Sequence, residues 1–146
     1  METVLIVDDS QCVLEYLRRV LLIEGYTVLT ASGGQEAVEA AARWHDRIDL
    51  LITDVAIRPM SCTVMVAELH AQHPDVKVFY ISGHSRDVVA DLGVPSDAFF
   101  LQKPFSPGEV AQAVRRVLDG PRTGLPEGLT TAADRVARRA GTAGAR

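Results

Sequence analysis

Short apolar runs alternate with helical patterns five times over the first 120 residues of the chain. The apolar runs predict strands at 4–7, 26–31, 50–53, 76–81 and 98–101. After each run, apolar residues recur every three or four positions, which is the period of a helix with one buried face. This regular alternation predicts an α/β protein with a doubly wound parallel sheet of five strands, flanked by five helices.

Serine residues mark the expected helix starts. Ser10 and Ser61 stand directly before helical patterns, where a side-chain oxygen can accept a free backbone N–H. Ser106 to Glu109 form a capping box with proline at the first helical position. Ser32 and Gln35 suggest a second capping box. Gly25, Gly93 and Gly120 end predicted helices.

Composition indicates one globular domain followed by a tail. The chain has 146 residues, of which 47% are hydrophobic, enough for a domain spanning 1–120. Residues 121–146 are rich in Gly, Thr, Pro, Ala and Arg, and we expect a flexible, locally basic C-terminal tail.

Charge and targeting features restrict the partners. The formal net charge of -4 gives no overall basic footprint, so direct nucleic acid binding is not expected. The first apolar run is too short for a signal sequence or a membrane span, which favours a cytoplasmic protein that does not contact the membrane. Cys12 and Cys62 have no metal-binding spacing, and we expect both to be reduced, small apolar residues on helices.

Charged residues close three of the predicted strands. Asp8 and Asp9 follow the first strand, Asp54 follows the third, and Lys103 follows the fifth. Because the carboxyl ends of parallel strands share one edge, these side chains should converge where open α/β sheets bind ligands. Clustered carboxylates repel one another, so this edge is expected to bind a divalent cation. Hard oxygen ligands with room for water suit Mg²⁺.

Four short motifs extend this pattern to a known family. They are Val7-Asp8-Asp9-Ser10, Ile52-Thr53-Asp54-Val55, Ile81-Ser82-Gly83 and Leu101-Gln102-Lys103-Pro104-Phe105. Together, and in this order, they resemble the receiver domain of two-component response regulators, a chemotaxis-regulator-like family. The resemblance covers residues 1 to about 120. It implies a flavodoxin-like fold with strand order 2-1-3-4-5.

The resemblance also implies a role for each site residue. Asp54 would be the phosphoacceptor, and Lys103 would pair first with Asp54 and then with the phosphoryl group. Asp9, Asp54 and the backbone carbonyl of Ala56 would bind Mg²⁺ directly, whereas Asp8 would act largely through a bound water. The peptide bond between Lys103 and Pro104 would be cis, an isomer that proline makes accessible.

The resemblance assigns further positions to the conformational switch that phosphorylation would trigger and to the lifetime of the phosphoryl group. Ser82 would hydrogen-bond a phosphoryl oxygen, and Phe100 matches the position of the aromatic switch residue. Gly83 would leave space for the phosphoryl group. His84 lies two residues after Ser82, where a side chain can influence the access of water, so we expect it to modulate the phosphoryl lifetime.

The loop after the acceptor departs from the family pattern. Arg58 stands where the family has proline, Pro59 follows it, and Cys62 replaces a later glycine. Proline still restricts the backbone here, but one residue later. We therefore expect a changed loop shape over an intact site, with Arg58 either solvated or directed toward the acids.

The leading functional hypothesis is an Mg²⁺-dependent phosphoacceptor in a two-component system or phosphorelay, and not an enzyme acting on a separate substrate. Its partners would be a sensor histidine kinase or phosphotransfer protein and a downstream protein target, with the chain a monomer or weak dimer. One alternative is a pseudo-receiver scaffold that works without phosphorylation. The other is a haloacid-dehalogenase-type phosphatase, which also uses an aspartyl phosphate and Mg²⁺. That class carries Asp-x-Asp, whereas Asp8 and Asp9 are adjacent.

Overall fold

The computed structural model describes residues 1–120, apart from the side chain of Arg86. The predicted tail at 121–146 lies outside the described residues. The sheet is parallel, with the order β2-β1-β3-β4-β5, which confirms the predicted fold class and strand order. Its strands are β1 (Thr3–Val7), β2 (Thr27–Ala31), β3 (Leu50–Asp54), β4 (Lys77–Ser82) and β5 (Phe99–Gln102). Each observed boundary differs from the predicted one by at most one residue.

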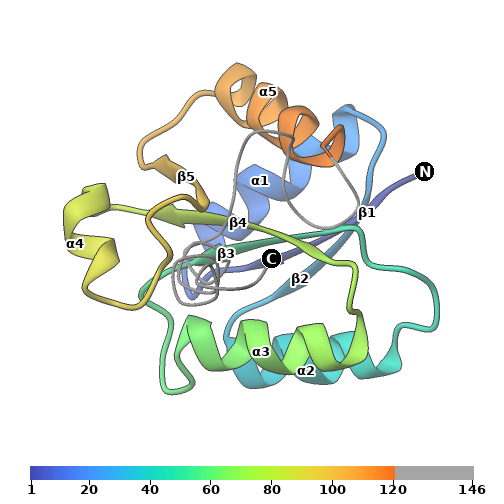
Figure 1. Ribbon diagram of the computed structural model, residues 1–146. Helices are drawn as coiled ribbons and strands as arrows, with labels where there is room; N and C mark the ends of the chain where they lie inside the picture. The colour runs from blue at the N-terminus through green and yellow to red at the C-terminus, as the bar shows by residue number, and fades with distance from the viewer. Residues whose placement is uncertain (121–146) are drawn as a thin grey trace, which may run out of the picture.

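Five helices in the described part of the chain cover the two faces of the sheet. They are α1 (Gln11–Ile23), α2 (Gly34–Arg43), α3 (Cys62–Gln72), α4 (Arg86–Ala90) and α5 (Pro107–Leu118). Helices α1 and α5 lie on one face, while α2 and α3 lie on the other (Figure 1). Helix α4 lies beyond the end of β4, close to β5 (Figure 1).

The central strands are continuous apolar runs because both of their faces are covered. Val4 and Ile6 of β1 are fully buried in the core under α1 and α5. Leu5 and Val7 point to the opposite face, into the core under α2 and α3. This alternation follows from the two-residue period of a strand. The two cores thus hold β1 from both sides, and Asp8 follows directly at its carboxyl end.

The helix caps agree with the sequence at three of four positions. The side chains of Ser10, Ser61 and Ser106 each accept a backbone N–H of the first turn, and Ser106 forms the predicted capping box with Glu109. The capping box predicted at Ser32 is wrong. Gly33 is the N-cap of α2, and no side chain caps it.

Ser32 instead bonds to Glu36, one residue beyond the predicted partner. The backbone N–H and the hydroxyl of Ser32 donate to Oε1 of Glu36 at 2.8 and 2.7 Å. Because the helix begins one residue later than predicted, the carboxylate rather than the Gln35 amide faces Ser32. The motif located the turn correctly but gave the wrong register.

A buried lysine holds the end of α5. Lys77 opens β4 and is only 6% exposed, and its Nζ donates to three carbonyl oxygens, two in the last turn of α5 and one just beyond its C-cap. The acceptors are Val117, Leu118 and Gly120, at 3.1, 3.2 and 2.7 Å. Burial lowers the pKa of the Lys77 ammonium. These bonds satisfy carbonyls that have no partner within the helix.

Two histidines lie at the end of α3, next to the edge of the sheet where the strands begin: His70 in its last turn and His73 at its C-cap. Nε2 of His70 lies 3.0 Å from the Val76 carbonyl oxygen, and Nε2 of His73 lies 3.0 Å from that of Ala41. Both rings therefore join loops and helix ends through hydrogen bonds. Trp44 packs against the core at the same rim, beside a hollow that His73 also lines.

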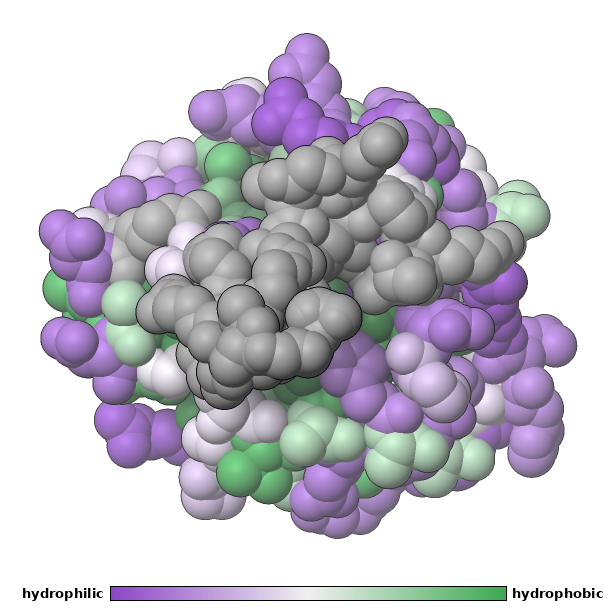
Figure 2. Space-filling model, in the orientation of Figure 1, coloured by the Kyte–Doolittle hydropathy of each residue, from purple (hydrophilic) through white to green (hydrophobic). Residues whose placement is uncertain are grey.

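Hydrophilic residues predominate around the uncovered part of the face shown in Figure 2, with local exceptions. Hydrophobic residues gather in the region of α3 on the face shown in Figure 2. Within α3, Val64 is 49% exposed. The two cysteines are free, and Cys62 is buried as expected, whereas Cys12 is exposed on α1. Within residues 1–120, no helix combines the length and apolarity needed to cross a bilayer.

Candidate functional site

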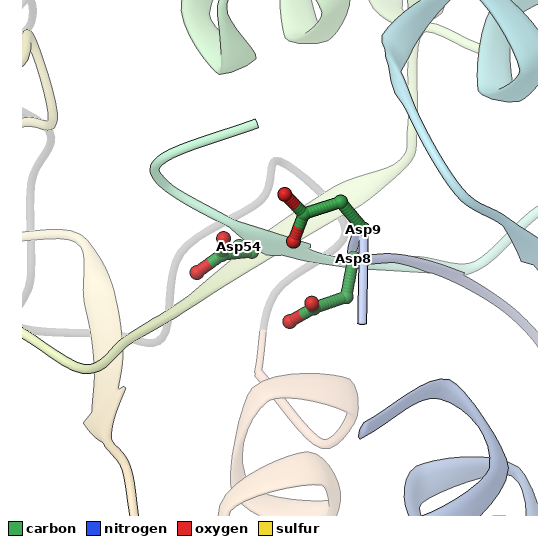
Figure 3. A group of neighbouring side chains, drawn as sticks. All are labelled: Asp8, Asp9 and Asp54. Carbon is green, nitrogen blue, oxygen red and sulfur yellow. The ribbon is translucent and has the colours of Figure 1, made fainter. Parts of the chain in front are cut away.

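Three carboxylates meet at the carboxyl edge of the sheet. Asp54 is the last residue of β3, and Asp8 and Asp9 directly follow β1. One oxygen from each carboxylate lies within 4.8 Å of the others. The side chains converge from two neighbouring strands onto one space (Figure 3). The sequence therefore placed these acids correctly, at the point where the strand order reverses between β1 and β3.

Lys103 reaches this pocket from the loop after β5. Its Nζ lies 2.9 Å from Oδ2 of Asp8 and 3.5 Å from Oδ1 of Asp54. The closer partner is thus Asp8, although the family resemblance pointed to Asp54 as the primary partner. The other oxygen of Asp8 accepts the backbone N–H of Ser10 at 2.8 Å. Asp8 is completely buried, so these two bonds compensate for its lost hydration.

The environment of Asp54 disfavours its charged form. Burial raises the pKa of this carboxyl, and the negative charge of Asp8 raises it further. The charge and hydrogen bond of Lys103 act in the opposite direction but do not cancel the increase. For Lys103, burial alone would lower the pKa, yet the hydrogen bond with Asp8 and the charge of Asp54 raise it above the ordinary value. The site therefore contains more negative charge than one ammonium neutralises.

The donor set suits a divalent cation. Within residues 1–120, Asp8, Asp9 and Asp54 form the one group of three or more acids, cysteines and histidines close enough to hold a metal. Their ligand atoms are all carboxylate oxygens, which Mg²⁺ prefers. Asp9 is exposed, so the cluster is open to solvent and leaves room for waters on the ion.

Ser82 and its neighbours form the wall on the β4 side. Ser82 closes β4 and is 1% exposed, and its Oγ accepts the backbone N–H of His84 at 2.9 Å. The backbone carbonyl of Ser82 accepts the N–H of Lys103 at 2.7 Å, which joins the two loops. A Cβ added at Gly83 would meet no atom within 4 Å, so the space directly beside this residue is open.

Both prolines near the site follow a cis peptide bond. The bond between Lys103 and Pro104 is cis, as the resemblance implies, and so is the bond between Arg58 and Pro59, which was not predicted. Arg58 and Ala56 are exposed on the loop after β3. The loop turns toward α2, because the Arg58 carbonyl oxygen lies 3.8 Å from where a Cβ on Gly33 would stand.

The two phenylalanines of β5 point to opposite faces, as predicted. Phe99 packs against the core under α1 and α5. Phe100 packs against the other core and pairs with Tyr80 of β4. Phe100 is partly buried and lies beside β4, the strand that carries Ser82.

Two neighbours of the site were not among the predicted site residues. Cys62 opens α3 with 1% exposure, and burial, followed by the charge of Asp54, raises the pKa of its thiol to about 11. Tyr16 of α1 donates its hydroxyl proton to the carbonyl oxygen of Phe105 at 2.9 Å. This second contact joins residues 89 positions apart, so no local pattern could have revealed it.

The sheet order is that of flavodoxin-like proteins, and the acids lie in a pocket at the carboxyl ends of the strands. Residues 4–115 match the family model of the response regulator receiver domain. The chain therefore belongs to the receiver domain family of two-component response regulators.

Relatives of known description agree with this assignment. The chain is 36% identical over 119 residues to the sensor kinase CckA of Brucella abortus, and the match covers 80% of this chain and 12% of that protein. It is 33% identical over 125 residues to the probable transcriptional regulatory protein TcrX of Mycobacterium tuberculosis, covering 84% of this chain and 51% of the relative. The chain thus spans about 12% of the first curated relative and about half of the second.

A solved structure supports the same fold. The response regulator receiver protein from Sinorhizobium medicae superposes with a TM-score of 0.70 at 29% identity. The superposition covers 81% of this chain and 94% of that one.

Proposed function

We propose that this chain is a phosphoacceptor whose Asp54 takes a phosphoryl group from the phosphohistidine of a sensor kinase or phosphotransfer protein. The observation that carries the proposal is the position of Asp54, which is 6% exposed and has two further carboxylates and one ammonium around it. A carboxylate is an effective nucleophile when it is held in line with the donor phosphorus.

The transfer is balanced without a further reactant. An oxygen of Asp54 forms a bond to phosphorus, and the bond between phosphorus and the donor nitrogen breaks. The electron pair of that bond returns to the donor nitrogen, and the other ring nitrogen of the donor carries a proton, so the leaving group is neutral imidazole. Phosphoryl transfer needs mainly positioning and neutralisation of the equatorial oxygens. Bound Mg²⁺ would supply positive charge to these oxygens.

Asp9, Asp54 and the carbonyl oxygen of Ala56 would hold the ion, and Asp8 would act largely through one of its waters. This division fits the burial of the two neighbouring acids. Asp8 is enclosed and already bonded to Lys103 and Ser10, whereas Asp9 is exposed. Lys103 would move from Asp8 toward the new phosphoryl oxygens and pair with them.

The test of this function is labelling of the protein by acetyl phosphate, followed by intact mass. We expect one phosphoryl group per chain in the presence of Mg²⁺ and none when EDTA removes it. Turnover of a generic phosphate ester would instead favour the phosphatase alternative. A pseudo-receiver scaffold would remain unlabelled in both conditions.

The phosphoryl group would then change the region around α4. It adds roughly -1.5 to -2 charge, by analogy with other phosphoresidues. Ser82 and Lys103 would be drawn toward it, which moves the loop after β4 and frees space for Phe100 to turn inward. Helix α4 has five residues and is held to the core through Val89, while Val88 is 45% exposed. This weak attachment supports α4 as the movable element.

Amide hydrogen exchange should detect this movement. We expect beryllium fluoride, a phosphoryl mimic, to change the exchange rates of the α4 amides severalfold in the presence of Mg²⁺. The amides of α2 serve as the control, because α2 packs on α3 and the opposite end of the sheet. Equal α4 exchange with and without the bound mimic would contradict the switch.

Gly83 and His84 would set how long the phosphoryl group persists. Gly83 leaves open space beside Ser82, and the backbone of His84 is bonded to the Ser82 hydroxyl. The imidazole of His84 would then influence the approach of water. We expect a His84→Ala variant to lose phosphate at a rate at least about twofold different from the parent, which is far below the roughly 100-fold or larger effect of a side chain that transfers a proton in the reaction. An unchanged rate would remove this role.

The downstream output would be a protein contact. The matched relatives include a sensor kinase and a probable transcriptional regulatory protein, so receivers of this kind occur in both contexts. We favour a phosphorelay receiver that acts on a protein target, as a monomer or weak dimer, without binding nucleic acid itself. A phosphotransfer profile against candidate kinases would identify the donor.

A further inference from the structure

Tyr16 links helix α1 to the loop that carries Lys103. The hydroxyl of Tyr16 donates to the carbonyl oxygen of Phe105 at 2.9 Å. The two aromatic rings also touch, with centroids 6.0 Å apart and planes tilted by 35°. Tyr16 therefore holds both the backbone and the side chain of Phe105, which stands two residues after Lys103.

This contact completes the attachment of a very short loop. The loop runs from the end of β5 at Gln102 to Ser106, the N-cap of α5. At one end, the N–H of Lys103 donates to the carbonyl of Ser82 at 2.7 Å. At the other end, the capping box fixes Ser106. The hydrogen bond from Tyr16 holds Phe105, which lies between these two attachment points.

The position of this loop sets the position of the ammonium. Nζ of Lys103 lies 2.9 Å from Asp8 and 3.5 Å from Asp54, and its side chain is only 25% exposed. A displacement of the loop by a fraction of an ångström would change both distances. Misplacement of a reacting group by about 1 Å can cost about 100-fold in rate.

We propose that Tyr16 is a positioning residue for Lys103 and so contributes to phosphoryl transfer without touching the phosphoryl group. The proposal rests on the proposed function of Asp54. Phenylalanine at this position keeps the ring contact with Phe105 and removes only the hydroxyl donor. The carbonyl of Phe105 then loses a bond that holds the loop toward α1.

Tyr26 provides a matched control. Its hydroxyl accepts a hydrogen bond from Nη1 of Arg115 at 3.1 Å, and its ring is 7% exposed in the same core layer. Tyr26 directly precedes β2, at the rim opposite the acidic pocket. Tyr26→Phe therefore removes the same atom from a comparable environment without touching the loop of Lys103.

The experiment measures acetyl phosphate labelling of the full chain in saturating Mg²⁺. For Tyr16→Phe, we expect the maximal rate constant to fall about fivefold, the factor that corresponds to one net hydrogen bond. The acetyl phosphate concentration at half-maximal rate should change less than twofold. Such a split indicates mispositioned catalytic groups rather than weaker donor binding. Tyr26→Phe should label at the parental rate.

A second measurement separates this inference from the function on which it rests. Amide exchange at Lys103, Phe105 and Ser106 should become severalfold faster in Tyr16→Phe and stay unchanged in Tyr26→Phe, whether or not the chain is labelled. Parental labelling of Tyr16→Phe, or equal slowing in both variants, would overturn the inference. If even the parent chain is not labelled, the proposed function fails, and unchanged exchange of this loop would then overturn the role of Tyr16 separately.

Discussion

Replacing Asp54 with asparagine should reduce labelling by acetyl phosphate to background, even in saturating Mg²⁺. The amide has nearly the same shape as the carboxylate but lacks the nucleophilic charge. Asp8 and Asp9 remain in this variant, yet neither should substitute as acceptor. Asp8 is completely buried and bonded to Lys103 and Ser10, and Asp9 is exposed to solvent. Intact mass should therefore show no phosphorylated species.

Asp46 provides the control for this substitution. It is exposed on the loop after α2, at the opposite rim of the sheet. Asp46→Asn makes the same chemical change and should be labelled like the parent. Labelling of Asp54→Asn at a rate close to that of Asp46→Asn would show that the acceptor is another side chain.

The same assay has a defined pH dependence. Burial and the charge of Asp8 raise the pKa of Asp54, so its carboxylate is lost at a higher pH than that of an ordinary aspartate as the solution is acidified. Labelling should fall as the pH decreases through this raised pKa. Increasing Mg²⁺ should shift the decline to lower pH, because a nearby cation favours the carboxylate.

Replacing Lys77 with methionine should lower the free energy of unfolding by roughly 1–3 kcal/mol. Methionine fills a similar volume but donates no hydrogen bond. The carbonyls of Val117, Leu118 and Gly120 would lose their common donor at the end of α5. Part of this loss is offset because the ammonium pays a desolvation cost, which is visible as its lowered pKa.

Arg116→Met is the matched control. Arg116 is a basic residue in the same last turn of α5 but is exposed. Its replacement should change the free energy of unfolding by less than about 0.5 kcal/mol, as is usual for surface positions. Urea denaturation of both variants measures the difference. A Lys77→Met variant as stable as Arg116→Met would mean that water or neighbouring donors replace the ammonium without cost.

Local sequence patterns were sufficient to predict the helices and strands and the meeting of the acids at one edge of the sheet. The strands at β1 and β3 were predictable because uninterrupted apolar runs require a sheet covered on both faces. Parallel strands then bring residues at their carboxyl ends together, so Asp8, Asp54 and Lys103 could be placed near one another before their distances were known. The prediction at Ser32 failed because two glycines allow the helix to begin at either of them.

Contacts between distant residues could not be predicted in the same way. The bond from Tyr16 to Phe105 spans 89 positions, and the bond from Lys77 to Val117 spans 40. Both depend on how α1, β4 and α5 are placed in three dimensions. In the sequence, Tyr16 looks like an ordinary helix residue, and Lys77 like a polar residue at a strand start. The choice of Asp8 as the nearer partner of Lys103 likewise depends on side-chain geometry within the pocket.

The place of Trp44 determines what intrinsic fluorescence can measure in this protein. The chain contains a single tryptophan, which is partly buried and packs against the core at the rim where the strands begin. Emission from this indole should therefore follow loss of the whole fold and serve as the optical signal for urea titrations. The same indole lies far from the acidic pocket, at the opposite edge of the sheet, so its emission should change little when a metal ion binds there. Metal affinity is therefore better measured by calorimetry or with a probe attached near α4.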